Sequence, residues 1–244
     1  MDRPSLESLT AAHTGDRDRF FEQAFGSELG WNAHAGEQPS VPTDAITKTG
    51  TTTVGLTADD GVVLATDRRA SLGHMVSSKT VQKVEQIHPT GALTIAGSVS
   101  AAQSLLRSLR AEVSLYEARR GEEMTMTALS TLTGNFLRSG AFLIVQPVLG
   151  GVDDDGAHVF SLDALGATME EDYTVSGSGS QFALGVLEQQ YETGCSIEEG
   201  VTVAARSVKS ALERDTASGN GIVTAKVTAD GVDIDAYDNI DELV

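Results

Sequence analysis

The stretch TTTVGLTADDGVVLATD, residues 51–67, decides the fold of this 244-residue chain. Two runs rich in β-branched residues, 51–56 and 61–67, flank the turn sequence TADD at 57–60. β-Branched residues favour extended backbone, and a short polar cluster followed by glycine favours a tight turn. The stretch therefore predicts a β-hairpin. A threonine opens its first strand and an aspartate closes its second.

Periodic apolar patterns continue from this hairpin to the C-terminus. They predict strands over 81–87 and 92–96, helices over 102–116 and 125–138, strands over 142–149, 158–162 and 173–176, helices over 183–191 and from 196 onward, and a final hairpin of 222–228 with 232–237. Ser196 and Glu199 form a capping-box pair. Because each helix pair needs a sheet face to cover, this order predicts an α/β four-layer αββα sandwich. A doubly wound sheet would need strict alternation of strand and helix, which the chain lacks.

The composition changes near residue 50. Residues 1–50 hold three of the five prolines, the sole tryptophan (Trp31) and little periodic apolar pattern. Phe20, Phe21 and Phe25 fit one short helical face, and the rest is typical of a flexible segment. The sequence therefore predicts one folded domain over 51–244, preceded by a separate N-terminal segment.

The charge balance excludes some partners. Asp and Glu total 35 against 17 Lys and Arg, and the net charge of -18 argues against a nucleic-acid backbone as partner. Only five of the cations are lysines. A strongly acidic, lysine-poor surface suits a salt-rich cytoplasm, where self-repulsion is screened, as in a halophile. A surface that repels acidic substrates is the rival explanation.

The sequence also indicates the compartment. It has no apolar run long enough to span a membrane and no secretory signal pattern. Its single cysteine, Cys195, cannot form an internal disulfide. These observations predict a cytoplasmic protein that contacts no membrane.

Common catalytic motifs are missing. The five histidines are scattered without metal-ligand spacing, so neither a metal nor an organic cofactor is expected. The sequence GSGS at 177–180 fits neither a serine-hydrolase elbow nor a phosphate-binding loop. Taken in isolation, Ser178 with Gln181 predicts only a helix cap, and Thr51 only a residue of a sheet.

Six short segments in a fixed order change this interpretation: GTTTVG at 50–55, ATDRRAS at 65–71, VQKV at 81–84, AGS at 96–98, GSG at 177–179 and RDTASG at 214–219. With them the chain resembles the β-subunits of the proteasome, which are N-terminal-nucleophile hydrolases. The resemblance covers residues 51–244, and residues 1–50 match as a propeptide.

The resemblance implies an endopeptidase that becomes active when autocatalytic cleavage between Gly50 and Thr51 frees the amine of Thr51. A threonine hydroxyl is a weak nucleophile until a base accepts its proton. The free α-amine, with a pKa of about 7.7–8.0, would be that base. Its absence before cleavage would keep the precursor inactive.

The resemblance also assigns the other residues of the site. Lys83 would lower the pKa values of the Thr51 hydroxyl and amine, and Asp67 would hold Lys83 charged and oriented. Gly97 would donate an N–H to the oxyanion. The amine would be surrounded by Ser178, Asp215 and Ser218. The substrate-binding positions would be Ala70, Ser71, Val81, Ile95, Gly97 and Val99.

Simpler interpretations stand beside these roles. Asp67 with Lys83 could be an exposed salt bridge of little energetic value, and 215–219 could be a helix C-terminus closed by glycine. The pocket predicts cleavage after large hydrophobic residues, whereas Glu85 could reach it and admit a basic one.

The implied partners are other β-subunits in a heptameric ring, α-subunits, an ATP-driven unfoldase and unfolded polypeptides. The alternatives are a bacterial relative that forms simpler double rings, a non-catalytic scaffold subunit, and an amidase of the same superfamily.

Overall fold

The hairpin predicted from residues 51–67 forms the middle of a five-stranded antiparallel sheet. Strands β1 (Thr52–Ala58) and β2 (Gly61–Asp67) pair with Thr53 opposite Thr66. The sheet has the order β10-β1-β2-β11-β12, where β10 is Tyr173–Gly177, β11 is Ile222–Thr228 and β12 is Gly231–Tyr237. The first strand thus pairs with a strand more than 100 residues away in sequence.

The computed structural model describes residues 50–72, 74–140, 142 and 145–244. All of them belong to one compact unit, Ile46–Val244. The predicted separate segment, Trp31 and the short helical face of Phe20, Phe21 and Phe25 lie outside the described residues, so the predicted boundary at residue 50 stays a prediction.

A second five-stranded antiparallel sheet lies against the first. It has the order β5-β6-β7-β8-β9, with β5 Val84–His88, β6 Gly91–Thr94, β7 Val148–Asp153, β8 Gly156–Leu162 and β9 Thr168–Glu170. Fully buried valines and leucines from both sheets form one hydrophobic cluster, including Val62, Leu64, Val148 and Val159. The two sheets therefore share an apolar core.

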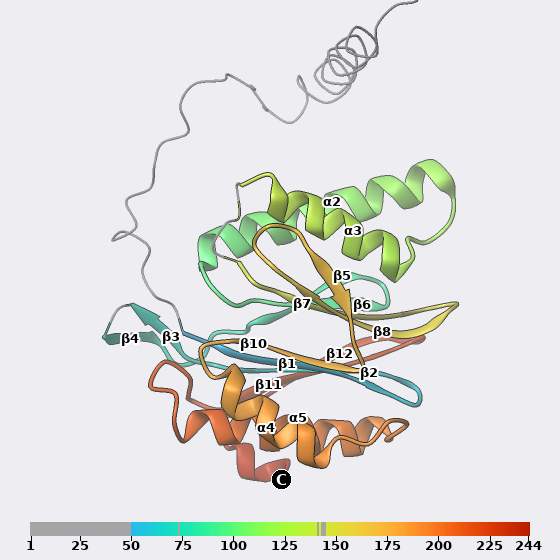
Figure 1. Ribbon diagram of the computed structural model, residues 1–244. Coiled ribbons are helices and arrows are strands. Elements are labelled where there is room, and N and C mark those ends of the chain that lie inside the picture. Colours follow the sequence, from blue (N-terminus) through green and yellow to red (C-terminus); the bar gives the residue numbers. More distant parts are fainter. Residues whose placement is uncertain (1–49, 73, 141, 143–144) are drawn as a thin grey trace, which may run out of the picture. The chain divides into compact units, whose positions relative to one another are not determined.

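Two helix pairs cover the outer faces of the two sheets (Figure 1). Helices α2 (Val99–Arg120) and α3 (Met126–Arg138) share a buried cluster with the second sheet. Helices α4 (Ser180–Gln190) and α5 (Ile197–Leu212) share another with the first. The predicted capping box of Ser196 and Glu199 begins α5. The α/β class predicted from the element order is confirmed.

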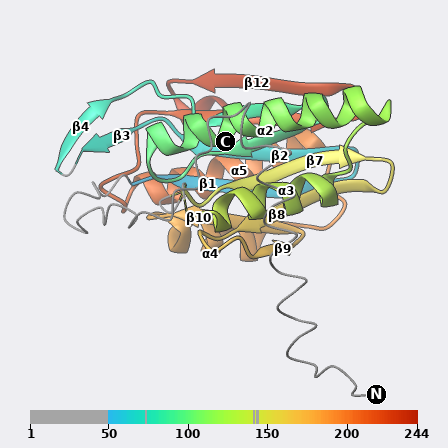
Figure 2. The same cartoon turned by 90° about the horizontal axis from the view of Figure 1, so that it is seen from above.

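One hairpin was not predicted. Strands β3 (Ala70–Leu72) and β4 (Met75–Ser78) form a separate two-stranded sheet that projects at one end of the molecule (Figure 2). Met75 is 72% exposed there. β1 begins at this same end (Figure 1), so the hairpin stands near Thr51.

Three predicted boundaries were wrong for physical reasons. The strand expected over 142–149 begins only at Val148, because Pro147 cannot donate to a sheet ladder. The strand expected from Val81 begins at Val84, since the N–H of Val81 bonds to the carbonyl of Arg68 instead. The helix C-terminus suggested at 215–219 is also wrong, because α5 already ends at Leu212.

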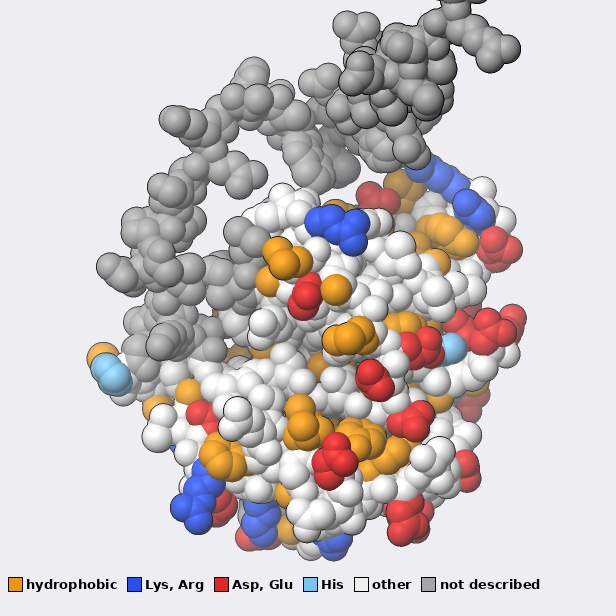
Figure 3. All heavy atoms as spheres, in the orientation of Figure 1, with side chains coloured by type: hydrophobic (Ala, Val, Ile, Leu, Met, Phe, Trp, Pro, Cys, Tyr) orange, Lys and Arg blue, Asp and Glu red, His pale blue; other side chains and the backbone are white. Residues whose placement is uncertain are grey.

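Acidic side chains are spread over the face that Figure 3 shows. This agrees with a net charge of -18 carried by the surface of a folded protein rather than by a single run of acids. Among the described residues, no helix is both long and apolar enough to cross a membrane.

Candidate active site

Thr51 lies at the start of β1 and is only 4% exposed. The Lys83 ammonium donates two hydrogen bonds there, one to Thr51 Oγ1 at 2.8 Å and one to Asp67 Oδ1 at 2.8 Å. Lys83 is therefore in direct contact with both of the other residues predicted for the catalytic centre. In the part of the chain that the structure describes, no other Lys or Arg side chain makes a hydrogen bond to the Thr51 hydroxyl.

The hairpin brings Asp67 and Thr51 together, because the end of β2 lies beside the start of β1. Lys83 precedes β5 in the other sheet, and its carbonyl accepts from the N–H of Ile95 at 2.7 Å. Its side chain thus reaches from the second sheet to the first. The site needs both sheets to be in place.

Asp67 is fully buried, and both of its oxygens are used. Oδ1 accepts from Lys83 and from the N–H of Thr52 at 3.1 Å. Oδ2 accepts from the N–H groups of Arg69 at 3.0 Å and Gly219 at 2.9 Å. A carboxylate with this many donors can be buried charged, because each lone pair lost from water is replaced.

The Lys83–Asp67 pair is not a surface salt bridge. The side chains are 6% and 0% exposed. Burial lowers the pKa of Lys83 from its usual value, and the charge and hydrogen bond of Asp67 oppose this shift only in part. A lysine whose pKa is lowered by burial gives up its proton more readily than a surface lysine does, so a larger fraction of it is the neutral amine near neutrality.

A second polar cluster holds the nitrogen of Thr51. Ser178 Oγ accepts from the N–H of Thr51 at 3.2 Å and donates to Asp215 Oδ2 at 2.6 Å. Ser218 donates to the same oxygen of Asp215 at 2.7 Å. The three residues predicted around the amine therefore meet beside it, and Asp215 orients both hydroxyls.

Ser178 is not the helix cap that its local sequence suggested. The residue before α4 is Gly179, which makes no side-chain capping bond. The hydroxyl of Ser178 is engaged by Thr51 and Asp215 instead. A local pattern could not reveal this, because these partners lie 127 and 37 residues away.

The remaining predicted residues differ in how much they are buried, and no hydrogen bond joins them to Thr51 among the described residues. Gly97 has a φ of 114°, which favours glycine, and stands immediately before Ser98, the N-cap of α2. Ser71 is 8% exposed, and its hydroxyl donates to the carbonyl of Ala217 at 3.5 Å. Ala70 and Ile95 are half-buried, as is Val81, whereas Val99 is 43% exposed.

Glu85, which could admit a basic substrate side chain, has a partner of opposite charge in the chain. Its carboxylate pairs with Nη2 of Arg110 in α2 at 2.9 Å. The pair is partly exposed, and the suggested role of Glu85 stays a prediction.

Sequence reasoning missed Thr52 and Arg69. The Thr52 hydroxyl is fully buried and bonds to Ser218 Oγ at 2.8 Å. Arg69 donates from Nε to Asn220 at 2.9 Å and from Nη1 to the carbonyl of Thr216 at 2.8 Å, fixing the turn that holds Asp215 and Ser218. Both residues could have been suspected from the sequence, because Thr52 follows Thr51 and Arg69 lies two residues after Asp67.

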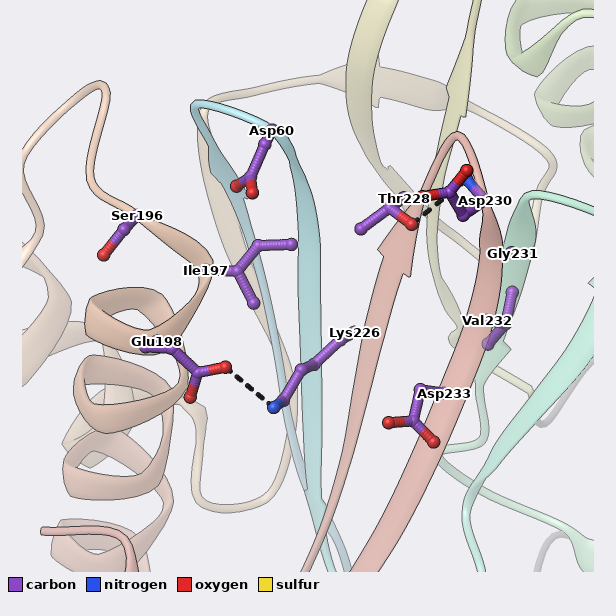
Figure 4. Close-up of a pocket in the computed structure, with 10 residues that line it drawn as sticks. All are labelled: Asp60, Ser196, Ile197, Glu198, Lys226, Thr228, Asp230, Gly231, Val232 and Asp233. Carbon is purple, nitrogen blue, oxygen red and sulfur yellow. Dashed lines mark hydrogen bonds and ion pairs between the residues drawn. The ribbon is translucent and has the colours of Figure 1, made fainter.

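A hollow lies at the other end of the first sheet, away from Thr51. Figure 4 shows the turn of β1 and β2, the start of α5 and the β11–β12 hairpin around it, with Glu198 directed at Lys226. None of its lining residues belongs to the predicted site. Among the described residues, no group of three or more His, Cys, Asp or Glu could hold a metal ion.

A threonine hydroxyl in contact with a buried lysine, which is itself paired with a carboxylate, has the partners that activate a hydroxyl group. The family described as "Proteasome subunit" matches residues 47–227. The chain belongs to this family.

The similar proteins named "Proteasome subunit beta" cover nearly the whole chain. That of Haloquadratum walsbyi is 66% identical over 230 residues, which are 94% of this chain and 93% of that protein. That of Haloferax volcanii is 64% identical over 238 residues, or 98% and 95%. That of Halorubrum lacusprofundi is 62% identical over 224 residues, or 91% and 92%. These halophilic relatives match the expectation drawn from the acidic composition.

Proposed function

We propose that this chain is a threonine-type endopeptidase subunit of the proteasome core particle, with Thr51 as its nucleophile. One observation carries the proposal: the buried ammonium of Lys83 lies 2.8 Å from both Thr51 Oγ1 and Asp67 Oδ1. A buried ion pair contributes little to stability on its own, because desolvation offsets the attraction. Its placement on a hydroxyl is therefore better explained by chemistry.

In the cleaved subunit the α-amine of Thr51 takes the hydroxyl proton as Oγ1 attacks a substrate carbonyl. The nitrogen already contacts Ser178 Oγ, so the amine would be oriented as soon as it forms. The N–H of Gly97 would stabilise the oxyanion. The substrate amide bond then breaks, its amine leaves with the proton that the Thr51 amine took up, and the carbonyl carbon remains bound to Oγ1 as an ester. Water hydrolyses this ester, which releases the carboxylate product and regenerates the hydroxyl.

In the precursor the nitrogen of Thr51 is an amide and cannot accept this proton. The neutral amine of Lys83, which burial favours by lowering the pKa of this side chain, is the described basic group in contact with Oγ1. Cleavage forms the Thr51 Oγ1–Gly50 ester as the Gly50–Thr51 amide bond breaks, and the nitrogen leaves with the proton. Water then hydrolyses the ester, which gives a Gly50 carboxylate and a free Thr51.

The wider assembly follows from family membership and belongs to the same proposal. The fold is the four-layer αββα sandwich of N-terminal-nucleophile hydrolases, with residues 1–50 as the propeptide. The partners are other β-subunits in a heptameric ring, α-subunits, an ATP-driven unfoldase and unfolded polypeptides. The particle would work in the cytoplasm.

The decisive test replaces Thr51 with alanine in the full-length chain. Peptide hydrolysis and removal of residues 1–50 should both be lost, because the only proposed nucleophile is gone. Thr53→Ala is the matched control, since it removes a threonine hydroxyl from the same strand without touching Lys83, and it should remain active. Turnover near wild type in the Thr51→Ala protein would refute the proposal.

Maturation has its own readout in Trp31, the sole tryptophan. Mass spectrometry of the purified particle should report a subunit beginning at Thr51, and the isolated, denatured subunit should emit no tryptophan fluorescence. The Thr51→Ala chain should keep that emission. Tryptophan emission from the subunit of active particles would contradict the free-amine mechanism.

Substrate preference is the finer part of the proposal. Val81, Ile95 and Val99, with Ala70 at the edge, offer apolar walls, and burying a large apolar side chain is worth about 1.5–3 kcal/mol. Glu85 is paired with Arg110. Fluorogenic peptides should therefore be cleaved preferentially after large hydrophobic residues, and preferred cleavage after Lys or Arg would overturn this assignment.

A further inference from the structure

Gly50 occupies a place where no side chain fits. The residue is buried, and a Cβ atom added to it would overlap the Cβ atom of Ala217. The same added atom would lie 3.0 Å from Ala217 Cα and 2.9 Å from Ser178 Oγ. Non-bonded carbon atoms pack at about 3.5–4.0 Å, so these distances require something to move.

Ala217 is not free to move away. Its N–H donates to Asp215 Oδ1 at 3.2 Å, and its carbonyl accepts from Ser71 Oγ at 3.5 Å. The next residue, Ser218, bonds to both Asp215 and Thr52. Displacing Ala217 would pull on the hydrogen bonds that hold the nitrogen end of Thr51.

We infer that the methyl group of Ala217 is the specificity determinant that restricts the residue before Thr51 to glycine. The inference rests on the proposed self-cleavage. A larger residue at position 50 would be displaced by the methyl group of Ala217, and its carbonyl carbon would then lie too far from Thr51 Oγ1 to be attacked. Misplacing reacting atoms by about 1 Å costs on the order of 100-fold in rate.

The same contact distinguishes the chain's own residue 50 from a residue of a peptide substrate. A substrate residue with a side chain cannot take the position of Gly50, because Ala217 fills the space beside it. It must place its side chain on another side of Thr51. Ala217 therefore acts on the choice of residue 50 alone and is not a catalytic residue.

The test is a double-mutant cycle in the full-length chain, with conversion to the form beginning at Thr51 followed by mass spectrometry. Gly50→Ala should slow cleavage on the order of 100-fold. Ala217→Gly in the same chain should recover at least tenfold of that loss, and the recovery is partial because Ala217 Cα and Ser178 Oγ remain close. Each rate is compared with that of Ala217→Gly alone.

Gly185→Ala is the matched control, because the same substitution inside α4 meets no atom within 4 Å and should leave cleavage unchanged. A Gly50→Ala chain that is cleaved at the wild-type rate would overturn the inference. A double variant that is cleaved as slowly as Gly50→Ala would overturn it as well. Thr51→Ala separates the two proposals. If that chain is still cut after Gly50, self-cleavage itself fails.

Discussion

Two lysines make ion pairs of nearly equal length at opposite ends of the β1–β2 hairpin. Lys83 lies 2.8 Å from Asp67 near Thr51, and Lys226 lies 2.9 Å from Glu198 beside the hollow in Figure 4. Burial lowers the pKa of Lys83, whereas the hydrogen bond to Glu198 raises the pKa of Lys226. The contact is the same, and the surroundings decide its effect.

Exposure separates the two pairs. The side chains of Lys83 and Asp67 are 6% and 0% exposed, against 27% and 76% for Lys226 and Glu198. Water screens the outer pair, which therefore contributes about 0–1 kcal/mol to stability. The inner pair is shielded from water and can act on the proton of a neighbouring hydroxyl.

The largest expected difference between the pairs is in activity. Lys83→Ala should lower the rate of peptide hydrolysis by at least about 100-fold, because proton transfer from the Thr51 hydroxyl to the amine contributes about 10²–10⁴-fold and would lose the charge that lowers the pKa values of both groups. Lys226→Ala makes the same change in the outer pair and should stay within about twofold of wild type. Fluorogenic peptide turnover measures both. If Lys83→Ala merely halved the rate, the pair would be structural only.

A smaller effect concerns two buried threonine hydroxyls, one bonded and one not. Thr52 Oγ1 is bonded to Ser218, whereas Thr224 Oγ1 is buried and has no hydrogen-bond partner among the described residues. Thr52→Val should lower the free energy of unfolding by about 1–3 kcal/mol, and Thr224→Val should raise it by about 1 kcal/mol. Denaturant unfolding of the uncleaved Thr51→Ala chain measures both. Changes of the same sign would contradict the bonding pattern.

The smallest expected effect is a pH dependence of opposite sign at two histidines. Burial disfavours the charged form of His158, but its bonds to Glu170 and Asp153 outweigh burial and raise its pKa. Its stabilising contribution is full below about pH 6.5 and is lost as pH rises through the raised value. Burial lowers the pKa of His88, so the protein gains stability there as pH rises towards about 6.5.

The measurement is the melting temperature of the full-length chain from pH 5 to pH 9, compared with those of His158→Gln and His88→Gln. The difference between wild type and His158→Gln should shrink above about pH 6.5. The difference for His88→Gln should change below that pH and in the other direction. Parallel curves for all three proteins would rule out both assignments.

Local patterns predicted most of the fold because the forces that form its elements are local. The hairpin of residues 51–67 and the capping box at Ser196 each depend on neighbours within a few residues. The β3–β4 hairpin escaped prediction because its strands are short and one residue pair, Met75 and Val76, is exposed. Neither strand shows the alternation of apolar and polar residues, over about 4–8 positions, that predicts a half-buried strand.

The sequence suggested which residues form the candidate site, but it did not reveal how deeply they are buried or what they bond to. The resemblance assigned Thr51, Asp67 and Lys83 to the centre, and the structure places Lys83 in contact with both of the others. Nothing local revealed that the pair is buried or that Ser178 bonds to Asp215, because both depend on how two distant segments pack. The overlap between Gly50 and Ala217 is of the same kind.

The hydrogen bond from the N–H of Thr52 to Asp67 has a consequence for activation. It fixes the residue behind Thr51 from within the domain, and Lys83 and Ser178 fix Thr51 itself. None of these bonds involves residues 1–49. Loss of the leading segment then requires no rearrangement of these bonds, and the subunit should be active as soon as water has hydrolysed the ester between Gly50 and Thr51.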